Sequence, residues 1–232
     1  MHIYTMPVYE LDPYYMAFPP ADHANPDGLL AIGGKLTEDW LLMAYQNGIF
    51  PWFSEGDPIM WWSPNPRFVL KPENIKVSKS MRPYLNSEQY SFKLDTDFEQ
   101  VIEECSSVPR QGQNGTWITA HMKDAYTSLH RIGMAHSAEI WENGQLIGGL
   151  YGVAIGRMFF GESMFSKKAN ASKLALIRMC TWLAERGFHT IDCQVYSEHL
   201  ERMGAEHISR ESFIQLLRQG INQPSIRGIW KF

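Results

Sequence analysis

Three consecutive strands are predicted by the segment His136-Ser-Ala-Glu-Ile-Trp-Glu-Asn-Gly-Gln-Leu-Ile-Gly-Gly-Leu-Tyr-Gly-Val-Ala-Ile-Gly-Arg-Met-Phe-Phe-Gly-Glu162. Residues 136–141 and 146–155 are predicted strands, and Asn143-Gly144 between them is a strong signal for a type I′ hairpin turn. Gly156 starts another reversal before a third strand at residues 157–162. Strands joined by tight turns pair antiparallel, so this segment predicts the centre of an antiparallel sheet.

Helices are predicted on both sides of these strands. One begins after the N-cap Thr119 and ends at Gly133, and another spans residues 171–186. A fourth strand at residues 188–196 and a last helix from Ser209 complete the order helix, three strands, helix, strand, helix. This order predicts an α+β fold with a mixed, mostly antiparallel sheet, and it resembles the acyl-CoA N-acetyltransferase (GNAT-like) plan.

The N-terminal part is predicted to form a small separate domain. We assign residues 1–90 to it and residues 91–232 to the GNAT-like domain. The small domain holds a proline-stiffened loop with Trp52, Trp61 and Trp62. Two interpretations of this loop have equal weight: it stacks a base or another large flat group, or it fills a seam between domains.

Composition indicates a globular chain without a membrane span. The 232 residues are 44% hydrophobic and 20% charged, and the net charge of −4 means that nucleic-acid contact needs a local basic patch. No stretch reaches the roughly 20 apolar residues of a membrane helix, and the N-terminus lacks a signal-peptide pattern. The histidines show no metal-ligand spacing, and Cys105, Cys180 and Cys193 show no CxxC, which predicts no metal and reduced thiols in the cytoplasm.

Two polar clusters lie in apolar strand surroundings and are the candidates for chemistry. One contains Glu162 and Ser163, and the other is Asp192-Cys193-Gln194. Burial suits a carboxyl group to handle a proton or bind a cation. Strand alternation places Asp192 and Gln194 on one face and Cys193 on the other, in the core, which disfavours a cysteine nucleophile. An equally weighted alternative is that the carboxylates only bind backbone amides at strand ends.

Three further features have both a ligand-binding and a structural interpretation. The glycines of Gly148-Gly-Leu-Tyr-Gly152 admit a ligand or mark a bulge, and the bulge is favoured. Asn170 opens a helix whose N-terminus binds an anion or is simply capped. Lys76, Lys79 and Arg82 contact a phosphate backbone or form a solvated edge.

Taken together, nine motifs resemble those of the leucyl/phenylalanyl-tRNA–protein transferase family. The resemblance spans roughly residues 18–213, which is nearly the whole chain, and nine motifs in order are highly specific although each one alone is weak. The motifs are Gly28-Leu-Leu-Ala-Ile-Gly-Gly34, Ala44-Tyr-Gln-Asn-Gly-Ile-Phe-Pro-Trp52, Trp61-Trp-Ser-Pro-Asn-Pro-Arg67, Gly115-Thr-Trp-Ile-Thr119, Ala135-His-Ser-Ala-Glu139, Gly148-Gly-Leu-Tyr-Gly152, Gly161-Glu-Ser-Met-Phe165, Asn170-Ala-Ser-Lys173 and Ile191-Asp-Cys-Gln194.

The resemblance implies a bacterial cytoplasmic enzyme that works as a monomer. It would move leucine or phenylalanine, and sometimes methionine, from Leu-tRNA or Phe-tRNA to an N-terminal arginine or lysine of a protein. The product would be an N-degron of the N-end rule pathway, which delivers it to the Clp protease. The ester is already activated, so no cofactor or metal is implied, and alignment of the reactants contributes about 7–11 kcal/mol at best.

The resemblance also implies a role for each candidate residue. Asp192 would act through Gln194 on the acceptor amine, and Glu162 with Asp192 would favour the cationic side chain, while a carboxylate and the tRNA ribose both stay candidates for relaying the proton. Trp52 and Trp117 would stack on the terminal adenosine. The other substrate-binding candidates, of which the first four form an apolar pocket, are Leu150, Phe159, Met164, Met179, Ser163 and Asn170. The implied tRNA contacts are Lys76, Lys79 and Arg82.

Two rival interpretations compete with this one. An acetyl-CoA-dependent N-acetyltransferase would need a glycine-containing loop before the central helix, and Ser166-Lys-Lys-Ala-Asn170 has no glycine. A non-catalytic module built on the tryptophan-rich loop would leave both polar clusters without a role. One departure from the family pattern is that Pro83, Asn86 and Ser87 stand where further basic residues often occur, which weakens the expected hold on tRNA.

Overall fold

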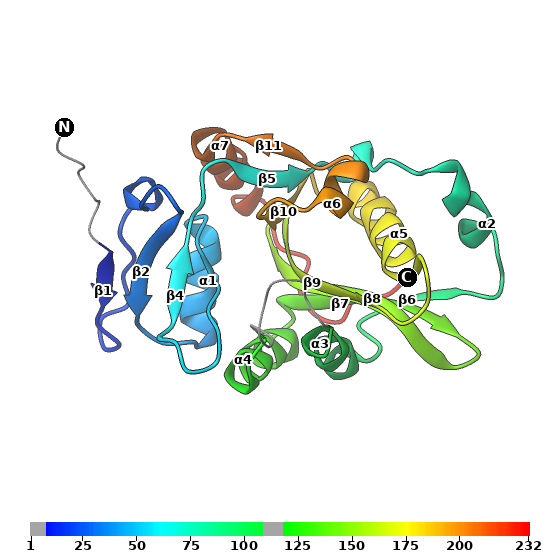
Figure 1. The fold of residues 1–232 in the computed structure, drawn as a ribbon, viewed down its shortest axis with the longest axis horizontal. Coiled ribbons are helices and arrows are strands. Elements are labelled where there is room, and N and C mark those ends of the chain that lie inside the picture. The colour runs from blue at the N-terminus through cyan, green and yellow to red at the C-terminus, as the bar shows by residue number, and fades with distance from the viewer. Residues whose placement is uncertain (1–7, 109–117) are drawn as a thin grey trace.

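The protein contains two β-sheets, and helices cover both faces of the larger one (Figure 1). The computed structural model describes residues 8–108 and 118–232. The strand order is β1-β2-β4-β3 in the four-stranded sheet and β11-β5-β10-β9-β8-β7-β6 in the seven-stranded sheet. Among the helices of these two ranges, none combines the length and the apolar character that crossing a membrane requires.

The small sheet lies in the N-terminal part and is backed by helix α1 (Glu38–Gln46) (Figure 1). Its strands are β1 (Tyr9–Leu11), β2 (Leu29–Gly33), β3 (Phe50–Pro51) and β4 (Met60–Trp62). Trp61 is fully buried between the sheet and α1, where its Nε1 donates to the Gly33 carbonyl at 2.9 Å and its ring stacks on Trp40. This member of the tryptophan run is therefore part of the domain core.

The large sheet is mixed because β9 and β10 pair in parallel, whereas its other neighbouring strands pair antiparallel. Its strands are β5 (Arg67–Leu70), β6 (Ser91–Leu94), β7 (Ala135–Glu142), β8 (Gln145–Ile155), β9 (Met158–Ser166), β10 (Thr190–Gln194) and β11 (Glu206–Ile208). The predicted α+β fold with a mostly antiparallel sheet is confirmed. Asn143 and Gly144 have φ values of +50° and +75°, as the predicted type I′ turn requires.

Helices α3 and α4 lie on one face of the large sheet, and α5 lies on the opposite face (Figure 1). The remaining helices are α2 (Arg82–Leu85), α3 (Phe98–Ser106), α4 (Ala120–Arg131), α5 (Ala171–Glu185), α6 (Glu198–Arg202) and α7 (Arg210–Ile221). The Thr119 hydroxyl accepts from the Met122 amide, so the predicted N-cap of α4 is confirmed. Helix α6 and strand β11 were not predicted, because both are too short to show periodicity.

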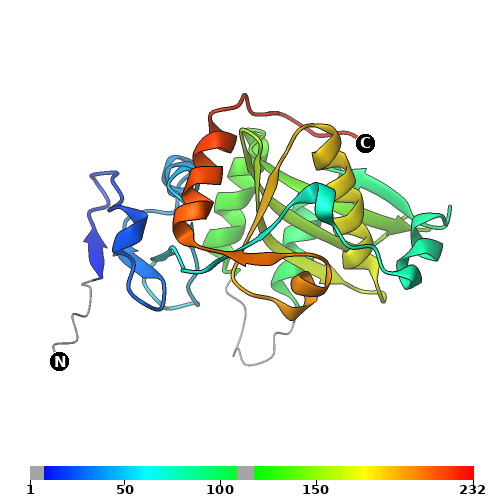
Figure 2. The ribbon, with the colours of Figure 1, turned by 90° about the horizontal axis from the view of Figure 1, so that it is seen from above.

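One strand from the N-terminal part of the chain, β5, belongs to the large sheet. Strand β5 precedes residue 90, yet it pairs with both β10 and β11. The division into residues 1–90 and 91–232 stays a prediction. Figure 2 shows the chain after α7, which runs back across the larger domain to the C-terminus.

At the glycines of β8, neighbouring atoms of the protein occupy the space that a side chain would need. A Cβ on Gly148 would lie 2.5 Å from the Ala171 Cβ of α5, and a Cβ on Gly152 would lie 2.6 Å from the Phe159 ring. The register between β8 and β9 shifts between Tyr151 and Gly152. The extra residue at this shift is Glu162 on β9, opposite Gly152, so the irregularity lies in the partner strand, and Gly152 admits the Phe159 ring.

Candidate active site

Glu162 of β9 is the centre of a buried hydrogen-bond network, and its partners come from three other elements. Its Oε1 accepts from the Tyr45 hydroxyl of α1 at 2.7 Å and from the Gln194 Nε2 of β10 at 2.8 Å. Its Oε2 accepts from the Tyr126 hydroxyl of α4 at 2.9 Å. Burial raises the pKa of Glu162 to about 7, although these hydrogen bonds act in the opposite direction.

The two tyrosines stay protonated donors at neutral pH. Burial raises the pKa of both Tyr45 and Tyr126 well above the usual value, and the nearby Glu162 charge adds to this rise. Their hydroxyls also contact each other. The two neutral hydroxyls therefore hold the carboxyl of Glu162 in a fixed orientation and leave its negative charge without a counter-ion among them.

Asp192 forms a fully buried ion pair with Arg67. The guanidinium binds it with two bonds, Nε to Oδ1 at 2.8 Å and Nη2 to Oδ2 at 2.7 Å. The rings of Phe50 and Phe213 lie 4.7 and 4.5 Å from the guanidinium carbon. Oδ1 of Asp192 also accepts from the Gln194 backbone amide at 2.9 Å, so this pair fixes the backbone that carries Gln194.

The predicted alternation of side chains along residues 192–194 is wrong. Gln194 has a φ of +65°, and the register of β10 against β5 shifts between Asp192 and Gln194. As a result Gln194 and Cys193 both line a cavity, whereas Asp192 does not. Cys193 was expected in the core and is instead half-buried. Desolvation raises the pKa of its thiol well above the usual range, which still disfavours a nucleophile.

The cavity next to this network has a volume of about 340 Å³ and a largely apolar lining. Its predicted members are Trp52, Leu150, Phe159, Glu162, Ser163, Met164 and Gln194. Further lining comes from Phe50 and Pro51 of β3, Leu176 of α5, Ile191 and Cys193 of β10, and the segment that follows β10. A pocket with a wide apolar part and a few polar groups at one place is the form expected of a small-molecule site.

The other predicted site residues that the structure describes do not line this cavity. Met179 is fully buried within α5, and Asn170 is the residue before α5, in a left-handed conformation with φ +68°. Trp117 lies outside the described residues. Lys76, Lys79 and Arg82 are exposed, and the Lys76 amide donates to the Met203 carbonyl directly after α6.

The tryptophans of the proline-stiffened loop lie in two different environments. Trp61 is core, whereas Trp52 is half-buried and lines the cavity. The Trp62 Nε1 donates to the Trp52 carbonyl at 2.6 Å, and the two rings lie 5.7 Å apart. Trp62 therefore holds Trp52 at the cavity wall.

Three residues of the site were missed in the sequence analysis: Arg67, Tyr45 and Tyr126. The tyrosines follow the apolar face of their helices, where a hydroxyl looks like ordinary core. Arg67 is the last residue of the Trp61–Arg67 motif and is followed by the apolar residues Phe68-Val-Leu70. An arginine at the start of an apolar strand could have indicated a buried charge that needs a carboxylate partner.

Comparison with known proteins identifies the family of this chain. The family model for leucyl/phenylalanyl-tRNA protein transferase matches residues 69–218, and the model for the N-terminal domain of the same family matches residues 34–65. A leucyl/phenylalanyl-tRNA–protein transferase of Syntrophus aciditrophicus is 51% identical over 93% of this chain and 90% of its own length. Its counterpart in Myxococcus xanthus is 50% identical over 97% of both chains.

Solved structures match less closely. A GCN5-related N-acetyltransferase from Kribbella flavida is 10% identical, the match covers 71% of this chain and 58% of that chain, and the TM-score is 0.34. A score this low does not establish a shared fold.

The catalytic class follows from the sequence relatives. The chain is an aminoacyltransferase, which sets aside the acetyl-CoA-dependent and non-catalytic alternatives. It belongs to the leucyl/phenylalanyl-tRNA–protein transferase family, whose members carry out transfer from aminoacyl-tRNA to protein.

The buried ion pair yields a stability prediction. Arg67→Met leaves the Asp192 charge buried without its partner, so the free energy of unfolding should fall by about 3–5 kcal/mol in urea titrations. Adding Asp192→Leu should recover most of this loss, because an apolar pair needs no charge compensation. The exposed pair between Arg202 and Glu198 is the control, and Arg202→Met should cost at most about 1 kcal/mol. Equal losses of unfolding free energy in Arg67→Met and Arg202→Met would contradict the conclusion that the Arg67–Asp192 pair is a buried ion pair.

Proposed function

We propose that this chain transfers leucine or phenylalanine, and also methionine, from aminoacyl-tRNA to the N-terminal arginine or lysine of acceptor proteins. The reaction takes place in the cytoplasm, the enzyme acts as a monomer, and the product is an N-degron of the bacterial N-end rule pathway. The observation that carries the proposal is a single cavity that joins an apolar wall to the Glu162–Gln194 network.

The apolar part of the cavity suits the side chain of the transferred amino acid. Leu150 of β8 pairs with Met164 of β9, and the Phe159 ring of β9 lies against Gly152, two residues along β8 from Leu150. An unbranched methionine adapts to side chains of different shape, and a wall without polar groups discriminates weakly between leucine and phenylalanine. Trp52, at the same cavity, offers a flat face to the terminal adenosine.

The polar part of the cavity suits the acceptor amine. Gln194 donates its Nε2 hydrogen to Glu162, which leaves its Oε1 as the acceptor for an amine hydrogen. The amine nitrogen forms a bond to the ester carbonyl carbon, the bond from that carbon to the ribose oxygen breaks, and the amine proton ends on the leaving oxygen. Asp192 acts as a positioning residue, because its charge is already matched by Arg67 and it touches Gln194 through the backbone.

Glu162 supplies the negative charge that favours an N-terminal arginine or lysine. Its two oxygens accept only neutral donors from the protein, so no side-chain cation neutralises it among its hydrogen-bond partners in the described chain. The tRNA body contacts Lys76, Lys79 and Arg82. In support, Lys76 is tied to the end of α6, and α6 contributes His199 and Leu200 to the cavity.

A transfer assay tests this function. Labelled leucine from Leu-tRNA should appear on a peptide that begins with arginine and stay absent from one that begins with alanine. Glu162→Gln should lower kcat/KM for the arginine peptide about 10- to 100-fold, because one charge-assisted contact is lost. Glu198→Gln, which changes an exposed carboxylate of α6, should leave it within about twofold. Equal labelling of both peptides, or of neither, would contradict the proposal.

The raised pKa of Glu162 predicts a pH effect on the arginine peptide. Above about pH 7 the carboxyl is charged and attracts the cation, and below that pH it gains a proton and loses the attraction. KM in the wild type should therefore rise as the pH falls below 7, and it should level off near the KM of Glu162→Gln. The Glu162→Gln variant has no titrating group at this position. The peptide amine titrates in the same way with both enzymes, so the pH dependence of the ratio of their KM values reports Glu162 alone. A ratio that stays constant with pH would contradict this role.

A further inference from the structure

The segment after α7 is bound along its length to the large domain. The Gly156 amide donates to the Ser225 hydroxyl at 2.8 Å, and the Gly228 amide donates to the Gly133 carbonyl at 3.3 Å. Near the C-terminus the Trp182 Nε1 donates to the Lys231 carbonyl at 3.2 Å. The match to the family model ends at residue 218, so this segment lies outside it.

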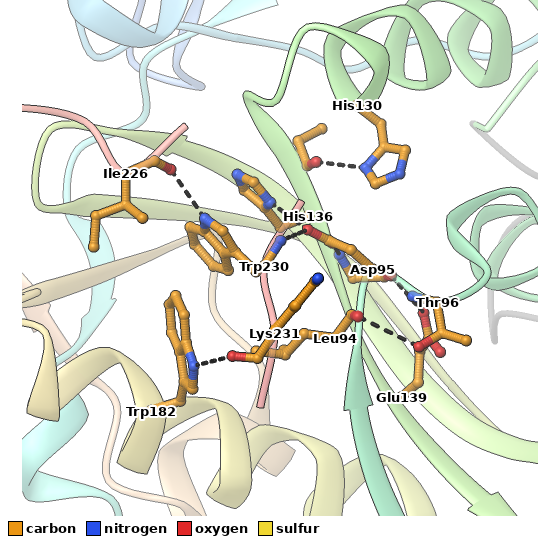
Figure 3. Close-up of polar contacts among 12 residues, drawn as sticks. Leu94, Asp95, Thr96, His130, His136, Glu139, Trp182, Ile226, Trp230 and Lys231 are labelled. Carbon is orange, nitrogen blue, oxygen red and sulfur yellow. Dashed lines mark hydrogen bonds and ion pairs between the residues drawn. The ribbon is translucent and has the colours of Figure 1, made fainter. Parts of the chain in front are cut away.

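Trp230 inserts from this segment into the core beside α5 (Figure 3). It is 2% exposed, and its ring stacks on His136 at 3.6 Å and contacts Trp182 at 4.4 Å. Its amide donates to Asp95 Oδ2 at 2.7 Å, the same oxygen that binds the His136 Nδ1 at 2.8 Å. Its Nε1 donates to the Ile226 carbonyl at 2.9 Å. Both the ring and the backbone of Trp230 are therefore fixed.

This tryptophan supports a wall of the cavity. The Trp230 ring lies 6.3 Å from the Phe159 ring, within the range of aromatic contact. Phe159 lines the cavity, and its ring also presses on Gly152, where even a Cβ would lie 2.6 Å away. Trp182, which contacts Trp230, belongs to α5, and α5 also contributes Leu176 to the cavity. The Trp230 indole thus contacts Phe159, which lines the cavity, and Trp182 of α5, a helix that also lines the cavity.

We propose that Trp230 is a positioning residue that sets the depth of the apolar cavity and thereby the size of the amino-acid side chain that the enzyme transfers. The inference rests on the proposed function in taking this cavity as the site of the transferred side chain. Trp230 itself touches no substrate. It acts through Phe159, which without the indole gains room to move away from the cavity.

The test is the ratio of phenylalanine to leucine transferred when Phe-tRNA and Leu-tRNA compete in one reaction. Trp230→Ala should raise this ratio about fivefold over the wild type, because a deeper cavity favours the larger side chain. Trp230→Leu, which keeps part of the volume, should give an intermediate ratio. The ratio does not depend on how much of a preparation is folded. A ratio within twofold of the wild type in both variants would overturn the proposal.

Phe232→Ala is the matched control. Phe232 lies in the same segment, is 68% exposed, and contacts Phe92 at 4.8 Å, away from Phe159. It should leave the ratio unchanged, and a shift as large as that of Trp230→Ala would show general loosening and overturn the proposal.

A crystal structure of Trp230→Ala separates this inference from the proposed function. Absence of transfer by the wild type would defeat the function, but the position of Phe159 would still test the inference. We expect its ring to move toward the vacated indole site and the cavity to grow. An unmoved Phe159 ring with an unchanged cavity would overturn the role of Trp230.

Discussion

The buried pair between Arg67 and Asp192 is the interaction on which the site depends. Arg67 opens β5, Asp192 lies in β10, and the guanidinium lies between Phe50 of the small sheet and Phe213 of α7. Two buried charges are tolerated only with good geometry and further hydrogen bonds. Because the guanidinium needs all of these contacts, the small sheet, the large sheet and α7 must meet at Arg67. The same carboxylate then holds the backbone of Gln194, whose left-handed conformation turns its side chain toward Glu162.

The Glu162 network extends this alignment to the helices. Tyr45 comes from α1 of the small domain and Tyr126 from α4, so both elements must be in place before the carboxyl has its partners. A partly satisfied buried network is unfavourable, which favours one arrangement of the two domains over others. The cavity forms where these constraints meet. Its apolar wall depends in turn on support from α5 and from the segment after α7.

Much of the fold was accessible from local patterns. The Asn143-Gly144 turn, the N-cap at Thr119 and the strand order around them depend on neighbouring residues, and the structure agrees with each. The site was harder, because its contacts join distant positions: Tyr45 and Glu162 are 117 residues apart, and Arg67 and Asp192 are 125 residues apart. Asp192 and Cys193 were misplaced because the positive φ of Gln194 breaks strand alternation, and periodicity does not encode such a residue.

A crystal structure with a non-hydrolysable phenylalanyl-adenosine tests the central claim, that this cavity is the aminoacyl-transfer site. The account predicts that the phenyl ring occupies the cavity of about 340 Å³ against Phe159 and Met164, with the adenine on Trp52 and the carbonyl carbon beside the Gln194 side chain. A ligand bound elsewhere, with this cavity unoccupied, would contradict the account.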